Sequence, residues 1–237
     1  MSFRFKQFSV RNDAAALRVN TDAVLLGAAC TVHPADGRVL DAGTGNGTVA
    51  LMVAQRLAAV RSGFRIRGID IDPASVREAA ANFSDSPWAP CLSADLCSLS
   101  EASGDEPYDL IVSNPPYFED SLRNPDARKA AARHAEELSY KTLTAFAADR
   151  LSPGGRLALI LPAEQEAALL QEARFCGLVP QRVLRIRTTA AKPPKRILAE
   201  CGRIAGEGFR EEELVMQEKG RYTEAYTDLV RDFYLWA

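Results

Sequence analysis

The sequence has few of the residues that build disulfides and metal sites. It contains five cysteines, an odd number with no Cys-X-X-Cys pair, and only two histidines, His33 and His134. A disulfide framework needs paired cysteines, and a zinc site needs clustered sulfur and imidazole ligands. We therefore expect neither a disulfide framework nor a bound metal, and we interpret the cysteines as reduced, packed side chains of small hydrophobic character.

Long apolar runs and a strong net charge are also missing. No stretch reaches the roughly 18 apolar residues of a membrane-spanning helix, and the opening MSFRFKQFSVRND lacks the apolar region of a signal peptide. The cytoplasm is the expected location, with no membrane partner. The formal net charge of -2 gives no overall attraction for nucleic acid, so such a partner requires a local basic patch.

What the sequence does contain is a regular alternation of short apolar stretches and helical patterns. The chain has 237 residues, 47% of them hydrophobic, which suits one large domain with or without an appendage. The alternation predicts a doubly wound α/β fold, with a mostly parallel sheet covered by helices on both faces. The candidate strands are 37–43, 64–71, 89–95, 108–114, 155–162, 178–187 and 195–206, and the candidate helices are 20–33, 49–61, 73–83, 139–151 and 164–176.

The end of the chain departs from this alternation. The last two candidate strands follow each other without a helix, so an antiparallel hairpin at about residues 178–206 is expected to close one edge of a seven-stranded sheet. The chain then ends on Phe233, Tyr234 and Trp236. An end rich in aromatic side chains is expected to be docked rather than frayed.

Glycines cluster where the first strand meets the next helix, in LDAGTGNGTVALMVAQR. Gly43, Gly45 and Gly47 permit a tight turn and let the backbone approach a ligand at the positive end of the helix. The spacing is GxGxG rather than the GxGxxG of dehydrogenases, and a plain tight turn is the alternative. Asp41 precedes the turn and is included with the glycines among the candidate cofactor contacts.

Polar residues end the next three strands. Asp70, in GIDIDP, is placed to accept hydrogen bonds from ribose hydroxyls, whereas Asp72 is expected to cap the helix that starts at Pro73. Asp95 ends the third strand at the same edge, and Asn114 follows the fourth. Each residue alone is typical of a turn or cap, but four such strand ends in succession predict a ligand site.

The fourth strand runs directly into SNPPYF, residues 113–118. Pro115 and Pro116 lack a backbone N–H and end the strand. An amine conjugated to a ring or carbonyl is a poor nucleophile because its lone pair is delocalised, and acceptors aimed at its two N–H bonds expose that lone pair. The Asn114 side-chain oxygen and the Pro115 carbonyl can be these acceptors, while Tyr117 offers a ring for stacking.

These four strand ends, in this order, resemble the S-adenosylmethionine-dependent class I methyltransferases. The resemblance implies a Rossmann-like sheet, S-adenosylmethionine as cofactor and S-adenosylhomocysteine as product. It also implies that the glycine turn backs the methionine part, Asp70 holds the ribose and Asp95 contacts the adenine amino group. NPPY resembles the signature of amino methyltransferases acting on adenine, guanine or the glutamine amide. Asn114, Pro115 and Tyr117 are thus the expected catalytic residues, with Asn114 also at the cofactor.

The chain also has FKQF near its start and AYT…FYL near its end, in addition to NPPY. With these motifs, the stretch from Phe3 to Trp236 is similar to a narrower family, the bacterial tRNA1(Val) (adenine-37) N6-methyltransferases. FKQF and AYT…FYL are the most specific parts of the resemblance. It implies methylation of the N6 amine of the adenosine 3′ of the anticodon in valine tRNA. We expect an N-terminal extension with a capping helix at 1–36, ahead of one compact methyltransferase domain at 37–237.

The same resemblance places Thr21 and Asp22 over the methionine end of the cofactor. Thr21 is equally a candidate helix cap, as is Asn20. Asn20 stands where we expect the family to have a glycine, so the geometry of the local turn is left open.

Two basic stretches are candidates for RNA contact. RVLRIRTTAAKPPKR contains no acid, and its basic residues are Arg182, Arg185, Arg187, Lys192, Lys195 and Arg196. We expect the last three to contact phosphates, the alternative being a solvated face. The segment after NPPY contains Phe118, Arg123, Arg128, Lys129, Arg133 and His134, of which Phe118, Arg128 and Arg133 are expected substrate contacts. This segment either orders over a bound nucleotide or is a mobile linker.

Other functions stay open on the sequence. A glutamine methyltransferase acting on protein shares NPPY but normally carries a substantial N-terminal helical domain, and only 39 residues precede Leu40. An amino methyltransferase acting on another RNA is a second alternative. A nicotinamide-dependent oxidoreductase needs a second half of the sheet and catalytic residues that are not found, and an intact NPPY argues against a silent cofactor-binding subunit. The oligomeric state is not indicated.

Overall fold

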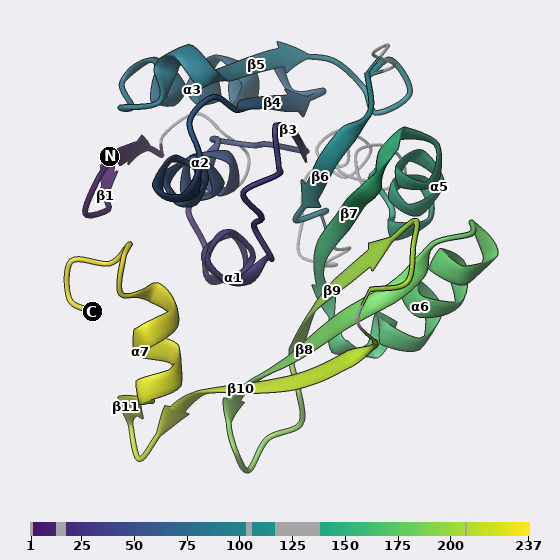
Figure 1. Cartoon of the computed structure of the whole chain (residues 1–237). Helices are drawn as coiled ribbons and strands as arrows, with labels where there is room; N and C mark the ends of the chain where they lie inside the picture. Colours follow the sequence, from purple (N-terminus) through teal and green to yellow (C-terminus); the bar gives the residue numbers. More distant parts are fainter. Residues whose placement is uncertain (1, 13–17, 103–105, 117–137, 207) are drawn as a thin grey trace, which may run out of the picture.

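The molecule is built around one wide β-sheet whose strands follow the apolar stretches of the sequence (Figure 1). The computed structural model describes residues 2–12, 18–102, 106–116, 138–206 and 208–237. Within them nine strands form the sheet. In spatial order they are β11 (Arg221–Tyr222), β10 (Arg210–Glu218), β8 (Val179–Thr189), β9 (Arg196–Gly202), β7 (Leu151–Pro162), β6 (Tyr108–Ser113), β3 (Arg38–Ala42), β4 (Arg65–Asp70) and β5 (Leu92–Leu96).

The predicted fold class is confirmed, but the sheet is wider than expected. The seven predicted strands form a contiguous block from β8 to β5, in which all neighbours are parallel except those of β9. The predicted hairpin of β8 and β9 is present. It does not close the sheet edge, because β10 pairs in parallel with β8 and β11 pairs with β10. The expected position of the hairpin at the edge is therefore wrong.

The strand order determines where a ligand can bind. From β3 the chain moves outward through β4 to β5, then returns to β6 on the other side of β3 and continues to β7. The carboxyl ends of β3 and β6 thus lie side by side at the point where the winding reverses. This point is the usual ligand crevice of an open α/β sheet.

Helices cover both faces of the sheet, each over its own apolar core. Val39 and Leu40 are neighbours in β3 but point into different cores, because successive side chains of a strand alternate. One face packs against α1, α2, α3 and α7, and the other against α5 and α6 (Figure 1). The helices are α1 (Thr21–Ala29), α2 (Thr48–Val60), α3 (Pro73–Ser84), α5 (Tyr140–Arg150), α6 (Glu166–Phe175) and α7 (Glu224–Val230), with 3-10 turns at Ala89–Cys91 and Ala163–Gln165.

Asparagine and aspartate side chains cap two of these helices. The Asn20 side-chain oxygen accepts the N–H of Ala23 at 2.9 Å, so Asn20 rather than Thr21 is the cap of α1. The backbone of Asn20 is extended, with φ -133° and ψ 167°, and no glycine is needed there. Asp72 accepts two backbone N–H groups in the first turn of α3 and is the cap that the sequence predicted.

The two ends of the chain pack against each other. The chain begins with an antiparallel hairpin of β1 (Ser2–Arg4) and β2 (Ser9–Arg11). In its turn, the Phe5 ring stacks on Tyr234 at 5.9 Å, and the Lys6 N–H donates to the Phe233 carbonyl at 2.8 Å. The predicted docking of the chain end is confirmed, although Trp236 is half exposed. The FKQF and FYL motifs therefore form a single contact between the termini.

A buried polar network holds the segment after α1 against the sheet. Arg156 on β7 donates to both carboxylate oxygens of Asp36, at 2.6 and 3.0 Å, and also to the Thr31 carbonyl. Glu200 on β9 accepts the backbone N–H of Thr31 at 2.5 Å and its hydroxyl at 2.7 Å. Arg156, Asp36 and Glu200 are almost fully buried, so the network is protected from solvent screening.

Candidate active site

The turn between β3 and α2 has a backbone that glycine adopts readily. Gly43, Gly45 and Gly47 have φ of 73°, 55° and 82°, all in the left-handed region. A Cβ at Gly47 would lie 2.4 Å from the Phe83 ring, so packing also requires glycine there. No atom lies within 4 Å of the corresponding position at Gly45. The turn therefore presents accessible backbone at Gly45, next to the N-terminus of α2.

Asp70 stabilises this turn from the end of β4. Its side chain is 3% exposed, and its carboxylate accepts the N–H of Gly45 and the N–H of Asp72, both at 2.9 Å. These two hydrogen bonds fix the glycine turn and the start of α3 to the end of β4.

Asp41 is a buried carboxyl group beneath the same turn. One of its oxygens accepts the Thr44 hydroxyl at 2.8 Å and the Ala50 N–H at 3.2 Å. Burial raises the pKa of Asp41 to about 7, and these two hydrogen bonds offset only part of the shift. Neither partner is positively charged, so the site is suited to a cation.

Asn114 follows β6 and lies beside the turn. The Ser113 hydroxyl donates to the Ala42 carbonyl at 2.7 Å, which joins the ends of β6 and β3. Pro115, which follows, is buried. The structure thus brings Asn114 to the glycine turn, across the reversal point of the sheet, and Pro115 is its neighbour in the chain.

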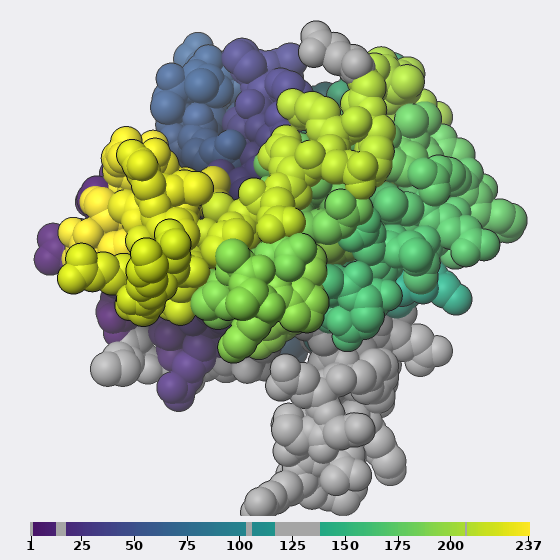
Figure 2. All heavy atoms as spheres, turned by 90° about the horizontal axis from the view of Figure 1, so that it is seen from below, coloured from purple at the N-terminus to yellow at the C-terminus, as the bar shows by residue number. Residues whose placement is uncertain are grey.

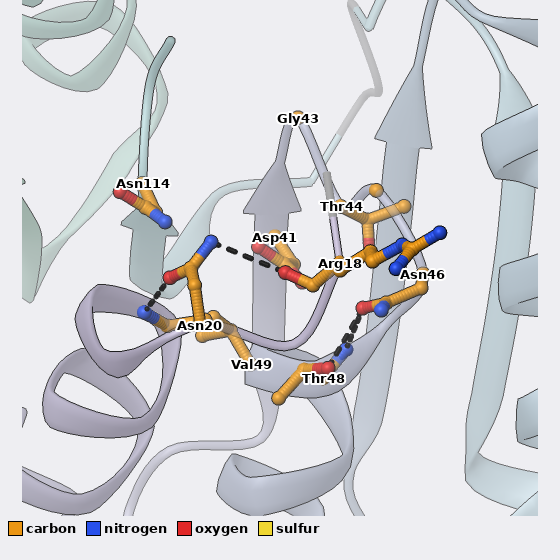
Figure 3. Close-up of a pocket in the computed structure, with 11 residues that line it drawn as sticks. Arg18, Asn20, Asp41, Gly43, Thr44, Asn46, Thr48, Val49 and Asn114 are labelled. Atoms are coloured by element: carbon orange, nitrogen blue, oxygen red, sulfur yellow. Dashed lines mark hydrogen bonds between the residues drawn. The ribbon is translucent and has the colours of Figure 1, made fainter. Parts of the chain in front are cut away.

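A pocket lies between the glycine turn, the start of α1 and Asn114 (Figure 3). Four of the predicted cofactor contacts line it, namely Asp41, Gly43, Gly45 and Asn114. The other lining residues are Arg18, Asn20, Ala23, Thr44, Asn46, Thr48 and Val49. The carboxyl edge of the sheet thus carries a pocket where the sequence predicted a ligand site.

Three asparagines that were not predicted as site residues join the N-terminal segment to this turn. Asn12 accepts the Val19 N–H at 2.9 Å and the Asn46 side-chain amide at 3.2 Å, and the Asn82 amide donates to the Asn46 carbonyl at 2.8 Å. Sequence reasoning overlooked these residues and Arg18. No local pattern signals them, because their contacts join positions far apart in the chain.

The start of α1 lies beside the pocket, but Asn20 and Ala23 line it rather than Thr21. Asp22 instead forms an ion pair with Arg196, at 2.8 Å. This pair joins the start of α1 to the start of β9, so the Arg196 guanidinium, one of the predicted phosphate contacts, is engaged with a carboxylate.

Asp95 lies at the far end of the row of strand ends, on the edge strand β5. One of its carboxylate oxygens accepts from Arg67 Nε at 2.6 Å, and its side chain is 43% exposed. Asp95 does not line the pocket at the turn. Its place two strands from β3 separates it from that pocket, and its side chain is partly open to solvent.

The arginines of β8 are neutralised by acidic neighbours. The ion pairs join Arg182 to Glu212, Arg185 to Glu166 and Glu211, and Arg187 to Glu213. Most of these acids lie on β10, which pairs with β8 and was not predicted as a strand. The pairs count against the interpretation of the β8 arginines as a phosphate-contact stripe.

Lys192 and Lys195 have a different environment. Both are exposed in the turn between β8 and β9. Because β8 runs parallel to β7 and β6, this turn lies at the same edge of the sheet as Asn114. Figure 2 shows the turn, in light green, on the surface of the molecule. The predicted residues Tyr117, Phe118, Arg123, Arg128, Lys129, Arg133 and His134 lie outside the described residues.

In the part of the chain that the structure describes, no three His, Cys, Asp or Glu side chains are grouped to hold a metal ion. Over the same residues, no helix has the length and apolar character to cross a membrane.

Sequence comparison identifies the family. A profile described as "Methyltransferase small domain" matches residues 19–177. The chain is 41% identical over 236 residues to the tRNA1(Val) (adenine(37)-N6)-methyltransferase of Parabacteroides distasonis, covering 98% of this chain and 97% of that protein. The chain belongs to this methyltransferase family. The family member from Photobacterium profundum is 36% identical over 237 residues, covering 98% of each chain. The family indicated by the sequence motifs is confirmed.

Solved structures agree on the fold. A crystal structure of a predicted O-methyltransferase from Agrobacterium tumefaciens superposes with a TM-score of 0.64 at 19% identity, covering 90% of this chain and 96% of that one. The glycopeptide N-methyltransferase MtfA in complex with S-adenosylmethionine superposes with a TM-score of 0.53 at 12% identity, covering 73% and 90%. The fold of this family member is thus the Rossmann-like fold of class I methyltransferases, as predicted, and S-adenosylmethionine is its cofactor.

Proposed function

We propose that this protein transfers a methyl group from S-adenosylmethionine to the exocyclic N6 amine of adenosine 37, just 3′ of the anticodon, in a valine tRNA. The observation that carries the proposal is the similarity over 98% of the chain to proteins of that name. The position of Asn114 and Pro115 beside the glycine turn supports the chemistry.

The described residues fit the cofactor. The accessible backbone at Gly45 admits a ligand at the N-terminus of α2, and the Asp41 carboxyl group in the pocket suits an ammonium group. Asp70 and Asp95 end the next two strands outward, in the order required for ribose and adenine. When bound, the cofactor supplies an electrophilic methyl group on a sulfonium.

Asn114 and Pro115 prepare the target amine. The Asn114 side-chain oxygen accepts one N–H and the Pro115 carbonyl the other, which opposes delocalisation of the nitrogen lone pair into the ring. The hydrogen bond from Ser113 to the end of β3 and the two prolines restrict this segment, so the acceptors are preorganised. Tyr117 and Phe118 follow directly, and we assign them to stacking on the adenine base.

The tRNA is held outside the pocket. We assign the exposed side chains of Lys192 and Lys195 to contacts with backbone phosphates, and Arg128 and Arg133 to the same task. A loop nucleotide is unpaired, so extruding its base costs less than opening a duplex. The pocket thus acts on one base, while the surrounding surface selects the RNA.

Methyl-labelled S-adenosylmethionine and two valine tRNA transcripts test this function. The transcript with adenosine at position 37 should gain a methyl group at N6, and the transcript with guanosine there should gain none. Equal labelling of both transcripts would overturn the proposal. Labelling of a protein extract but of neither transcript would instead support the glutamine methyltransferase that shares the NPPY signature.

The pKa of Asp41 predicts a pH-dependent affinity for the cofactor. Between pH 6 and pH 8 the carboxyl group ionises, since burial holds its pKa at about 7. The ionised form attracts the ammonium group, so affinity for S-adenosylhomocysteine, measured by calorimetry, should rise roughly tenfold over this range. The Asp41→Asn variant should bind weakly at both pH values. A parental affinity that is flat with pH would contradict this role.

Asp41→Asn also has an expected effect on stability. The folded protein holds a proton on Asp41 that the unfolded chain releases near its ordinary pKa of 3.8. This contribution to stability is therefore complete below that pH and is lost as pH rises through about 7. The melting temperature of Asp41→Asn should exceed that of the parent at pH 8, and the difference should shrink at pH 5. The opposite trend would mean that the pKa of Asp41 in the folded protein is not raised, so that the group is already ionised at pH 5.

Removing the charges of Lys192 and Lys195 together should weaken tRNA binding. The double change to glutamine is expected to raise the KM for tRNA. It should also reduce the slope of log affinity against log salt by about one for each phosphate that the lysines neutralise in the parent. Affinity for S-adenosylhomocysteine should not change.

A double replacement of Arg65 and Arg174 by glutamine is the matched control. It removes the same charge, but from exposed positions at the start of β4 and the end of α6, on the opposite edge of the sheet. It should leave the KM and the salt slope near the parental values. If both double variants changed the KM for tRNA and the salt slope equally, tRNA binding would depend on net charge alone and not on the turn between β8 and β9.

A further inference from the structure

The pocket beside the glycine turn has an arginine that the sequence motifs did not indicate. Arg18 lies on the connection from β2 to α1 and lines the pocket together with Asp41, Thr44 and Asn46. Figure 3 shows its side chain extending from that connection across the turn toward Thr44 and Asn46. A cation and a carboxyl group thus border one pocket.

The backbone that carries Arg18 is fixed from both sides. The side-chain amide of Asn20 donates to the Arg18 carbonyl at 3.2 Å, while its oxygen caps α1. The following N–H, that of Val19, donates to Asn12, which also accepts from Asn46 on the turn. Asn20 therefore connects Arg18 to the helix, and Asn12 connects it to the glycine turn. These hydrogen bonds fix the backbone from which the Arg18 side chain extends, so its position is preorganised.

Arg18 differs from the other arginines at this edge in its charge partners. Arg196 is paired with Asp22, and Arg67 with Asp95. Arg18 is an exposed residue, and the described residues contribute no acid to an ion pair with it. Nor does it neutralise Asp41, whose pKa is lowered only by hydrogen bonds from Thr44 and Ala50. The two charged groups of the pocket are thus both available to a ligand.

We infer that Arg18 binds the carboxylate of the cofactor's amino-acid end, opposite the site that Asp41 provides for the ammonium group. This inference rests on the proposed function. An α-amino acid carries an ammonium group and a carboxylate on the same carbon. The pocket offers Asp41 for the ammonium group and Arg18 for the carboxylate. The planar guanidinium suits a carboxylate because it can donate two parallel hydrogen bonds.

Binding measurements with two ligands test the inference independently of the methyl-transfer activity. The proteins compared are the parent, Arg18→Gln and Arg18→Lys. The ligands are S-adenosylhomocysteine and its decarboxylated analogue, 5′-deoxy-5′-(3-aminopropylthio)adenosine, which keeps the ammonium group. By calorimetry the parent should bind the first roughly 10- to 100-fold more tightly than the second. In Arg18→Gln this ratio should fall to nearly one, and Arg18→Lys should restore part of it.

Asp41→Asn is the matched control, because both ligands carry the ammonium group that Asp41 serves. It should weaken both and preserve their ratio. A ratio that survives in Arg18→Gln overturns the inference, and a simultaneous rise in the KM for tRNA would then assign Arg18 to a phosphate. A parent that does not discriminate between the ligands overturns it as well. If the parent binds neither ligand, the proposed cofactor site itself is wrong. If the parent binds both ligands but the ratio survives in Arg18→Gln, only the role of Arg18 is wrong.

Discussion

Replacing Asn114 with alanine is expected to slow methyl transfer by about 100- to 1000-fold, equivalent to roughly 2.7 to 4 kcal/mol of barrier. The reason is the loss of one of two acceptors that hold the N–H bonds of the target amine and expose its lone pair. The affinity for S-adenosylhomocysteine should change little, because Asn114 contributes only one of the eleven residues that line the pocket. Single-turnover rates with saturating tRNA and calorimetry with S-adenosylhomocysteine measure the two quantities separately.

Asn114→Asp is the matched variant, since it keeps an acceptor oxygen at the same place. It should retain more turnover than Asn114→Ala at equal cofactor saturation. Near-normal turnover in the alanine variant would show that Asn114 does not hold the amine. An equal loss of rate and cofactor affinity would instead mean that Asn114 serves the cofactor alone.

Replacing Arg156 with alanine should lower the free energy of unfolding by roughly 3 to 5 kcal/mol. The change leaves the Asp36 carboxylate buried without its bidentate partner, and it also removes the donor to the Thr31 carbonyl. The segment after α1 would lose its attachment to β7. Urea unfolding at pH 7, followed by circular dichroism, measures the change in the midpoint.

An exposed ion pair provides the comparison. Arg11 and Asp85 lie 2.6 Å apart, but both side chains are more than half exposed. Arg11→Ala should cost about 1 kcal/mol or less, because solvent screens the pair. A second test combines Arg156→Met with Asp36→Leu, which removes both buried charges and should recover part of the loss. Similar midpoints for Arg156→Ala and Arg11→Ala would show that the buried network contributes little.

Features set by neighbours in the chain were predictable. Asp72 before Pro73 signalled a capped helix, and α3 begins at Pro73 with Asp72 as its cap. The three spaced glycines signalled a tight turn, and all three have positive φ. In both cases a few consecutive residues impose the geometry through sterics and short-range hydrogen bonds, so no distant partner is needed.

Strand β10 shows where such reasoning fails. Its sequence, REEELVMQE, is rich in acids and reads poorly as a strand, since Glu is depleted in strands. The segment pairs with β8, whose arginines meet its acids across the sheet. Each of the two charged stretches is stabilised by the other. A sequence pattern within one segment cannot indicate ion pairs with another segment, so the strand was not predicted.

The sequence by itself determined the fold class, the family and the order of polar strand ends at one edge of the sheet, because strand and helix periodicity and the turn motifs are local properties. Only the tertiary structure decided which charges face a ligand. Arg196 pairs with Asp22, 174 positions away, whereas Arg18 lines the pocket beside the glycine turn. The choice of a charge partner depends on distance and burial in space, and these are established when the sheet and α1 pack together.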